Sequence, residues 1–307
     1  MATLYTHQSS NIRKTWLLFT VFFIVVIALG WVFTEAYGDP SILIIAVVFS
    51  IMMSIASFWY SDTIILRMTH ARPVTKESAR ELYNIVENLS ITAGLPVPKI
   101  YIIDEPAPNA FATGRNAERA VVAVTTGLLD KLDRSELEGV LAHELSHIGN
   151  RDMLVSTVSV ILVGFIALIS DFFLRSMFWR NIGGGDRDRG QAGVILMLAG
   201  IVLAILSPII ASLMQLAISR KREFLADASG ALLTRYPDGL ARALEKISRD
   251  NTPLKASNNA LNHLWLADPE KKRGRHWFAS LFMTHPPIEE RIRRLRLHEV
   301  KPREKNQ

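Results

Sequence analysis

The chain has 307 residues, of which 49 % are hydrophobic, and its mean hydropathy is +0.20. This apolar content excludes a largely disordered chain, and the absence of cysteine excludes disulfide scaffolds, iron–sulfur clusters and thiolate zinc fingers. The net charge of +6 permits nucleic-acid binding, but the sequence contains no nucleic-acid-binding motif, and basic residues beside membrane spans are the commoner cause in so apolar a chain.

Four uncharged apolar segments predict transmembrane helices, at residues 17–33, 42–60, 154–170 and 192–219. Each has about 17 residues or more, which is close to the minimum for crossing the hydrocarbon core. The first two are joined by a short turn-forming loop and predict a helical hairpin. The third contains several hydroxyl side chains, so it is either a span or a helix buried in the protein.

The distribution of Lys and Arg predicts how the first hairpin is oriented. Arg13 and Lys14 precede the first segment and Arg67 and Arg72 follow the second, whereas the loop between them has neither residue type. This pattern places both ends of the hairpin in the cytoplasm. The loop between the third and fourth segments carries four arginines, which argues against a cytoplasmic catalytic domain with four spans.

The chain therefore divides into four parts, and we expect an α+β membrane protein. Residues 1–60 and 153–219 form two transmembrane hairpins, and residues 61–152 and 220–307 form the two parts of a catalytic domain with a small β-sheet. In the first part, residues 74–93 have helical apolar spacing and end before Gly94. Residues 98–103 predict a strand, and residues 109–113 and 120–125 predict a β-hairpin.

The next helix carries the clearest chemical signal. We expect it to begin at a capping box formed by Ser135 and Glu138. His143 and His147 are four residues apart and share one helix face, with Glu144 directly after the first; this is the arrangement of zinc proteases. Zinc would lower the pKa of a water ligand to about 7, and Glu144 would be the general base. Two surface histidines are the alternative, which the many apolar residues of this helix disfavour.

A zinc site of this kind needs a third ligand, for which Glu223 is the candidate. Glu223 and Asp227 are four residues apart and share a helix face. In zincins with a glutamate ligand, the glutamate lies on a second helix and an aspartate four residues later orients the first histidine. We therefore assign Glu223 as third ligand of one zinc ion and Asp227 as the partner of His143. The alternative is an acidic pair that balances the basic residues before it.

Four motifs in this order resemble the HtpX membrane metalloproteases. They are residues 109–114, 143–147, 223–227, and 285–287 with Glu290 and Arg291. The resemblance covers nearly the whole chain, and the more distant CAAX prenyl proteases share parts of the pattern. It implies a zincin-like (gluzincin) catalytic domain in a bacterial inner (plasma) membrane, and zinc-dependent cleavage of misfolded or damaged membrane proteins in quality control.

The resemblance also implies roles for residues outside the zinc site. Asn109 and Ala110 would lie on the edge strand of the active-site sheet, where an unfolded peptide pairs as an added strand. Asn109 and His285 would flank the scissile carbonyl and stabilise its oxyanion, and Arg291 would support that region. From the residues alone, Asn109 is as well explained by a turn, and His285 by a break before two prolines.

Two other functions fit parts of the same sequence. A prenyl-protein protease would act on a lipidated C-terminus but needs a large intramembrane chamber, for which four spans are too few. A membrane scaffold or transporter with an idle or structural metal would have no need of Glu144, and structural zinc is usually held by four protein ligands. The sequence therefore favours an integral membrane zinc endopeptidase that acts on unfolded or membrane proteins.

Overall fold

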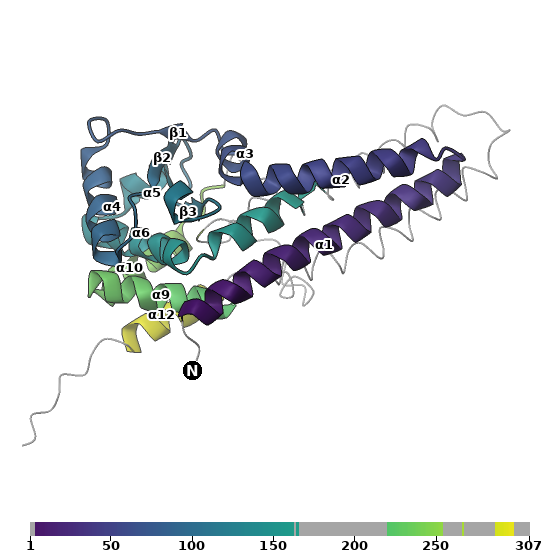
Figure 1. Ribbon diagram of the computed structural model, residues 1–307. Helices are drawn as coiled ribbons and strands as arrows, with labels where there is room; N and C mark the ends of the chain where they lie inside the picture. Colours follow the sequence, from purple (N-terminus) through teal and green to yellow (C-terminus); the bar gives the residue numbers. More distant parts are fainter. Residues whose placement is uncertain (1–3, 163, 166–219, 254–265, 267–285, 298–307) are drawn as a thin grey trace, which may run out of the picture.

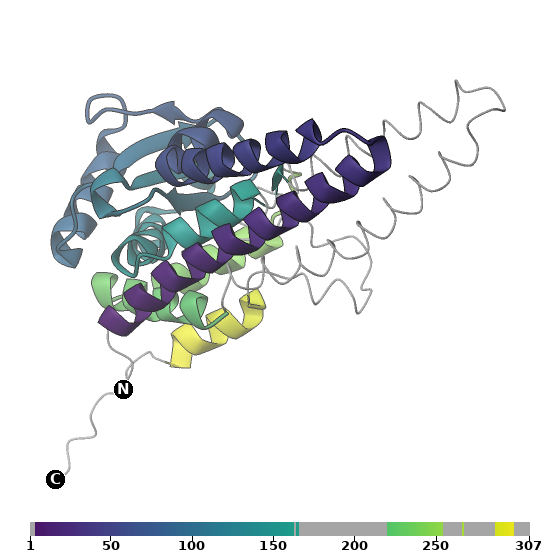
Figure 2. The same ribbon diagram turned by 45° about the vertical axis from the view of Figure 1, so that its right-hand side comes forward.

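The protein is described here from a computed structural model, which describes residues 4–162, 164–165, 220–253, 266 and 286–297. A long helical hairpin projects from a domain that contains several helices and a small sheet (Figures 1 and 2). The fourth apolar segment (residues 192–219), most of the second half of the third segment, and His285 lie outside the described residues.

The hairpin consists of α1 (Leu4–Tyr37) and α2 (Ser41–Trp59), which pack against each other. The turn between them contains Gly38, whose φ of +69° is a backbone conformation that glycine adopts without strain. Asn11–Trp31 and Ser41–Trp59 are long and apolar enough to cross a membrane, with hydropathies of 2.1 and 2.5. The predicted N-terminal hairpin is therefore confirmed as a pair of apolar helices.

The sheet has four strands in the order β1-β2-β4-β3. Their bounds are Arg72–Pro73 for β1, Lys99–Ile103 for β2, Ala110–Thr113 for β3 and Val121–Thr125 for β4. The two central strands, β2 and β4, are parallel, whereas β1 and β3 pair antiparallel at the two edges. Every residue of β4 is buried, as expected for a strand covered on both faces. The predicted strand and the predicted hairpin are both confirmed.

The helix predicted at residues 74–93 begins later than expected. α4 spans Arg80–Ala93, and the backbone N–H of Val74 instead donates to the carbonyl oxygen of Ile100 at 3.0 Å, which extends the pairing of β1 with β2. The apolar side chain of Val74 fitted a helical period although it belongs to the sheet. The helix ends as predicted at Gly94, which adopts the left-handed conformation.

The N-terminus of α6 (Arg134–Gly149) also differs from the prediction. Its N-cap is Asp133, whose carboxylate accepts from the backbone N–H of Glu136, and the Glu136 carboxylate accepts from the backbone N–H of Asp133. The capping box therefore lies two residues before the predicted one. Ser135 is inside the helix, and its hydroxyl donates to Asp133 at 2.7 Å.

The helix α6 lies at the centre of the domain. It packs against α4, α9 (Arg220–Thr234), α10 (Pro237–Arg249) and the edge strand β3. Its apolar side chains are fully or almost fully buried, as predicted: Leu137, Val140, Leu141, Leu145 and Ile148. The short helices α3 (Ser61–Met68) and α5 (Thr126–Lys131), the 3-10 turn at Ala117–Arg119 and the helix α12 (Ile288–Leu297) complete the described domain.

The backbones of α6 and α9 approach closely at Gly230, where a side chain has no room. A Cβ atom at this position would lie 2.9 Å from the backbone nitrogen of His143. We expect Gly230→Ala to destabilise the protein by roughly 1–3 kcal/mol through overpacking, although in an unpacked helix the same change stabilises by about 1 kcal/mol. Thermal unfolding in detergent tests this, with Ser229→Ala as the neighbouring control. A higher unfolding temperature for Gly230→Ala would contradict the close approach.

Candidate metal centre

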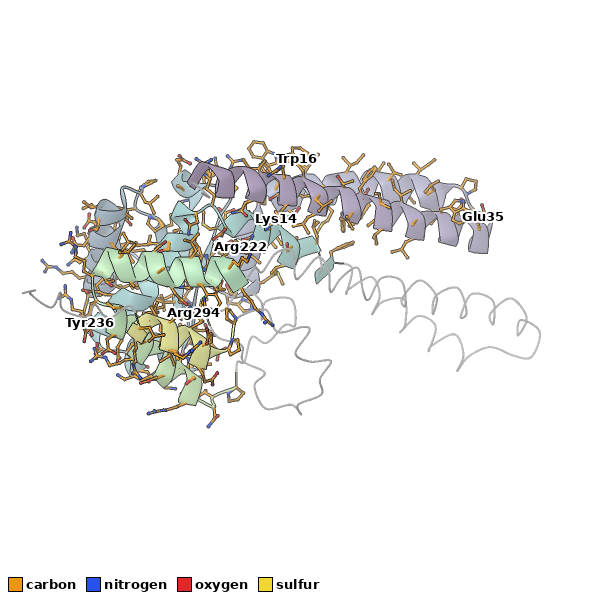
Figure 3. The ribbon with its side chains drawn as sticks, turned by 90° about the horizontal axis from the view of Figure 1, so that it is seen from below. Lys14, Trp16, Glu35, Arg222, Tyr236 and Arg294 are labelled. Atoms are coloured by element: carbon orange, nitrogen blue, oxygen red, sulfur yellow. The ribbon has the colours of Figure 1, made fainter. Side chains whose placement is uncertain are left out.

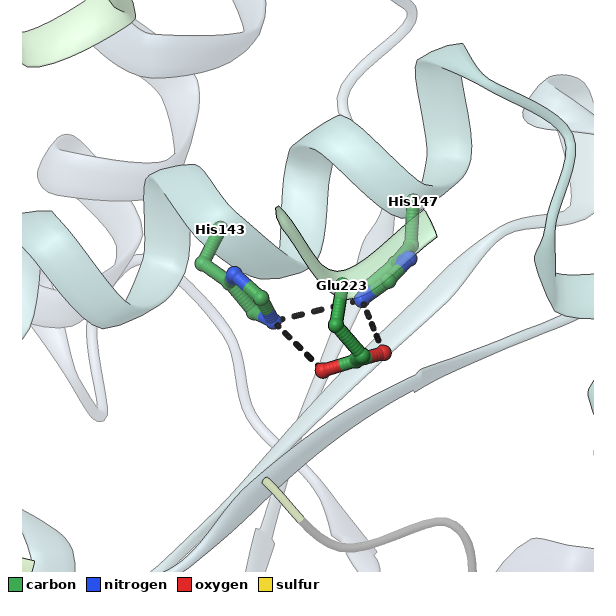
Figure 4. A group of neighbouring side chains, drawn as sticks. All are labelled: His143, His147 and Glu223. Atoms are coloured by element: carbon green, nitrogen blue, oxygen red, sulfur yellow. Dashed lines mark hydrogen bonds and ion pairs between the residues drawn. The ribbon is translucent and has the colours of Figure 1, made fainter. Parts of the chain in front are cut away.

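The contact between α6 and α9 brings together the three side chains that the sequence proposes as ligands. His143 and His147 come from α6 and Glu223 from the first turn of α9 (Figure 4). The Nε2 atoms of the two imidazoles are 3.2 Å apart, and the carboxylate oxygens of Glu223 lie 3.5 Å from Nε2 of His147 and 3.8 Å from Nε2 of His143. The two Nε2 atoms and the Glu223 carboxylate therefore face one point, with one carboxylate oxygen nearest each imidazole.

These side chains fit a zinc ion by their spacing and their chemistry. Ligands placed tetrahedrally at 2.0–2.1 Å from zinc lie about 3.3 Å from one another, and the two Nε2 atoms are separated by 3.2 Å, with one atom from each of the three residues within 4.8 Å of the others. Two imidazoles and one carboxylate are a ligand set of catalytic zinc sites, which hold the metal through three protein groups. Within the described part of the chain, this is the group of three acidic or histidine side chains that could hold a metal.

A buried carboxylate fixes the orientation of His143. Oδ1 of Asp227 is 2.9 Å from Nδ1 of His143, so the other ring nitrogen faces the site. The guanidinium of Arg291, which has no exposed surface, donates to both carboxylate oxygens of Asp227, at 2.9 and 2.7 Å. Burial alone would raise the pKa of Asp227, but the charge of Arg291 and the hydrogen bond with His143 lower it to about 2. Asp227 is therefore ionised at neutral pH.

Arg291 occupies a position that the sequence alone does not reveal. It comes from α12, and besides Asp227 it lies 3.8 Å from the Glu223 carboxylate and donates to the carbonyl oxygen of Leu266 at 3.3 Å. The resemblance implies that Arg291 supports the oxyanion region. The structure places its guanidinium among the carboxylates behind the metal ligands.

Asp152 lies beside the second histidine and was not singled out from the sequence. Its Oδ2 atom is 3.3 Å from Nδ1 of His147. Burial would lower the pKa of His147, but the hydrogen bond with Asp152 and the charge of Glu223 raise it to about 9 in the metal-free site. The sequence could have pointed to Asp152 because it is an acidic residue five positions after His147, just beyond the end of the helix.

Glu144 follows His143 on α6 and is 4 % exposed. Burial raises the pKa of this carboxyl group, while the neighbouring His143 and His147 act in the opposite direction. A carboxylate with a raised pKa holds a proton more readily than an exposed one. This environment suits a group that must accept a proton and later release it.

Asn109 and Ala110 lie where the edge strand β3 begins, and both are buried. The side-chain oxygen of Asn109 accepts from the backbone N–H of Ala110 at 3.1 Å. The carbonyl oxygen of Ala110 accepts from the backbone N–H of Leu266 at 3.1 Å. A peptide that paired with the edge strand at Ala110 would therefore have to replace two hydrogen bonds made within the chain.

Comparison with known proteins adds independent information. The sequence profile of peptidase family M48 matches residues 76–299. The chain is 44 % identical to a "Protease HtpX homolog" of Caldanaerobacter subterraneus subsp. tengcongensis over 297 residues, which cover 96 % of this chain and 97 % of that protein. A protein of the same name from Dictyoglomus thermophilum is also 44 % identical, with coverages of 96 % and 95 %.

A solved structure shares the fold at low sequence identity. The crystal structure of S. mikatae Ste24p superposes with a TM-score of 0.50 at 20 % identity, and the match covers 95 % of this chain and 67 % of that one. At this identity the likeness concerns the fold alone.

Proposed function

The chain belongs to peptidase family M48, and from this premise we propose that it is an integral membrane zinc endopeptidase that cleaves misfolded or damaged membrane proteins on the cytoplasmic side. Its family makes it a metalloprotease, and its substrates are proteins. The observation that carries the zinc chemistry is the convergence of His143, His147 and Glu223 on one point.

In the proposed mechanism, the side chains of this site each have one task. Bound zinc would polarise the scissile carbonyl and lower the pKa of a water molecule to about 7. Glu144 accepts the proton of the attacking water and then donates it to the leaving amine. Asn109 and His285 stabilise the oxyanion. Arg291 fixes Asp227, which orients His143.

The proposed substrate is an extended segment that pairs with β3, the edge strand next to α6. Pairing of this type uses backbone groups and makes few demands on side chains, so cleavage is broad in sequence and requires an unfolded segment. The bonds that Ala110 makes with Asn109 and Leu266 are exchanged when such a segment binds.

The proposed setting is a bacterial inner membrane, with residues 1–60 and 153–219 as two transmembrane hairpins and residues 61–152 and 220–307 as the cytoplasmic catalytic domain. Exposed aromatic side chains support this placement for the first hairpin. In Figure 3, Trp16 lies near the domain and Glu35 lies at the far end of α1, one helical turn beyond Trp31. Trp59 ends α2 beside the domain, where Arg115 lies 4.2 Å from its ring centroid. All three tryptophans are more than half exposed. Tryptophan is enriched at both surfaces of a bilayer.

Removal of zinc tests the proposed function. The full chain, purified in detergent, is incubated with unfolded casein before and after treatment with a chelator, and then with zinc restored. We expect cleavage to fall to background in the metal-free protein and to return with zinc, because the water is no longer activated without the ion. Unchanged cleavage by the metal-free protein would contradict a zinc peptidase.

A further inference from the structure

A buried polar cluster joins the first membrane helix to the end of α6 and the start of α9. It consists of Asn11, Asp152 and Arg222, which are 4, 3 and 8 % exposed. The amide nitrogen of Asn11 donates to Oδ1 of Asp152 at 2.8 Å, and Arg222 donates to the amide oxygen of Asn11 at 3.2 Å. Arg222 also lies 3.6 Å from the same Asp152 oxygen. Lys14 and Arg222 mark this junction in Figure 3.

The end of α6 turns back so that Asp152 lies beside His147. The backbone N–H of Arg151 donates to Ile148, and the backbone N–H of Asp152 donates to His147. These two bonds form the helix ending called a Schellman motif. Its left-handed position is usually glycine, but here it is Arg151, with φ of +55°. Arg151 thus has a strained backbone conformation, and it directly precedes Asp152, which lies beside the imidazole of His147.

We propose that Asp152 is the positioning residue of His147, that Asn11 and Arg222 fix its carboxylate, and that the first membrane helix is therefore a part of the metal centre. This inference rests on the zinc site proposed above. In this proposal, each histidine is oriented by an aspartate that is itself fixed by other side chains. Asp227 holds Nδ1 of His143 and is fixed by Arg291, while Asp152 holds Nδ1 of His147 and is fixed by Asn11 and Arg222.

The two carboxylate oxygens of Asp152 face different partners. Oδ1 faces the donors from Asn11 and Arg222, and Oδ2 faces His147. With zinc on Nε2, the imidazole would carry its proton on Nδ1, toward Asp152.

The substitution Asp152→Asn tests this assignment without a change of shape. Because Asn11 donates to Oδ1 and the positive charge of Arg222 lies beside the same atom, they would hold the new side chain with its oxygen toward them and its NH₂ group toward His147. The imidazole would then have to accept on Nδ1 and carry its proton on Nε2, the atom that should bind zinc. We expect the affinity for zinc to fall about 10–100-fold, measured by competition with a chelator on the full chain in detergent.

The substitution Asn11→Ala tests the part played by the membrane helix. It removes one of the two groups that fix Asp152, so we expect zinc affinity to fall about 5-fold, the usual effect of one hydrogen bond. The matched controls are Asn88→Ala and Asp130→Asn, which change exposed side chains on α4 and α5. Both controls should bind zinc as the wild type does. Cobalt in place of zinc gives a visible spectrum that reports the ligand geometry of each variant.

The zinc affinities of the two variants decide whether the inference holds. Loss of zinc affinity in folded Asp152→Asn and Asn11→Ala, with normal controls, supports the inference. Wild-type affinity and an unchanged cobalt spectrum in either folded variant overturn it. If Asp152→Asn does not fold, Asn11→Ala decides alone. A wild-type protein that binds no zinc would instead refute the proposed function.

Discussion

Glu144→Gln is expected to abolish cleavage while the protein keeps its zinc. Glutamine has the shape of glutamate but cannot accept the proton of the attacking water, and general acid–base catalysis contributes a factor of about 10²–10⁴. His143, His147 and Glu223 are unchanged in this variant, so zinc content and the unfolding temperature should match the wild type. Cleavage of unfolded casein and zinc analysis of the same sample measure both quantities.

A matched control for this variant lies on the same helix. Glu138→Gln makes the same chemical change at a partly exposed carboxylate that pairs with Arg134 on the outer face of α6. It should leave casein cleavage and zinc content unchanged. If Glu144→Gln retained cleavage within a few-fold of wild type, or lost its zinc and fold together, the general-base assignment would be wrong.

Glu223→Ala is expected to remove zinc from the protein. Only two imidazoles would remain as ligands. The guanidinium of Arg291 lies 3.8 Å from the Glu223 carboxylate, and without this negative charge it would repel the zinc ion. Zinc content after dialysis should fall from about one ion per chain to near zero, and casein cleavage should be lost with it.

The exposed residue Glu118 supplies the control for this second variant. Glu118→Ala removes a carboxylate of the same type from the turn before β4 and should leave zinc bound. A Glu223→Ala protein that retained a full zinc ion would show that the third ligand comes from another residue.

The candidate metal ligands could be proposed from the sequence because part of their signal is short-range. His143 and His147 share a helix face through the helical period alone, and the same period relates Glu223 to Asp227. The contact between the two helices joins residues far apart in the sequence, and it could be expected only from the resemblance to a known family. The resemblance named Arg291, but only the structure shows its bond with Asp227, 64 residues earlier in the sequence.

The errors in the secondary structure have equally specific causes. Two capping boxes overlap in the sequence, Asp133 with Glu136 and Ser135 with Glu138, and each satisfies the rule for a helix N-terminus. The structure contains the first, in which the buried Glu136 carboxylate also accepts from Lys246 of α10. Val74 directly follows β1 and falls within the predicted helix, but its backbone N–H bonds with Ile100 of β2.

The link between Asn11 and Asp152 is the feature furthest from prediction. The two residues are 141 positions apart, and one of them lies in a segment whose composition indicates a membrane anchor. Asn11 lies in the polar stretch at the start of α1, where side chains are expected to contact water or lipid headgroups. Its burial against the metal centre depends on how the hairpin docks on the domain.

The most direct measurement is a titration of zinc into the metal-free protein, with the rate of casein cleavage followed at each addition. A single catalytic site at His143, His147 and Glu223 predicts a rate that rises from background and saturates at about one zinc ion per chain. The Glu144→Gln protein should bind the same amount of zinc without cleavage. Full cleavage before zinc is added, or cleavage by zinc-loaded Glu144→Gln at the wild-type rate, would contradict a zinc peptidase built on this site.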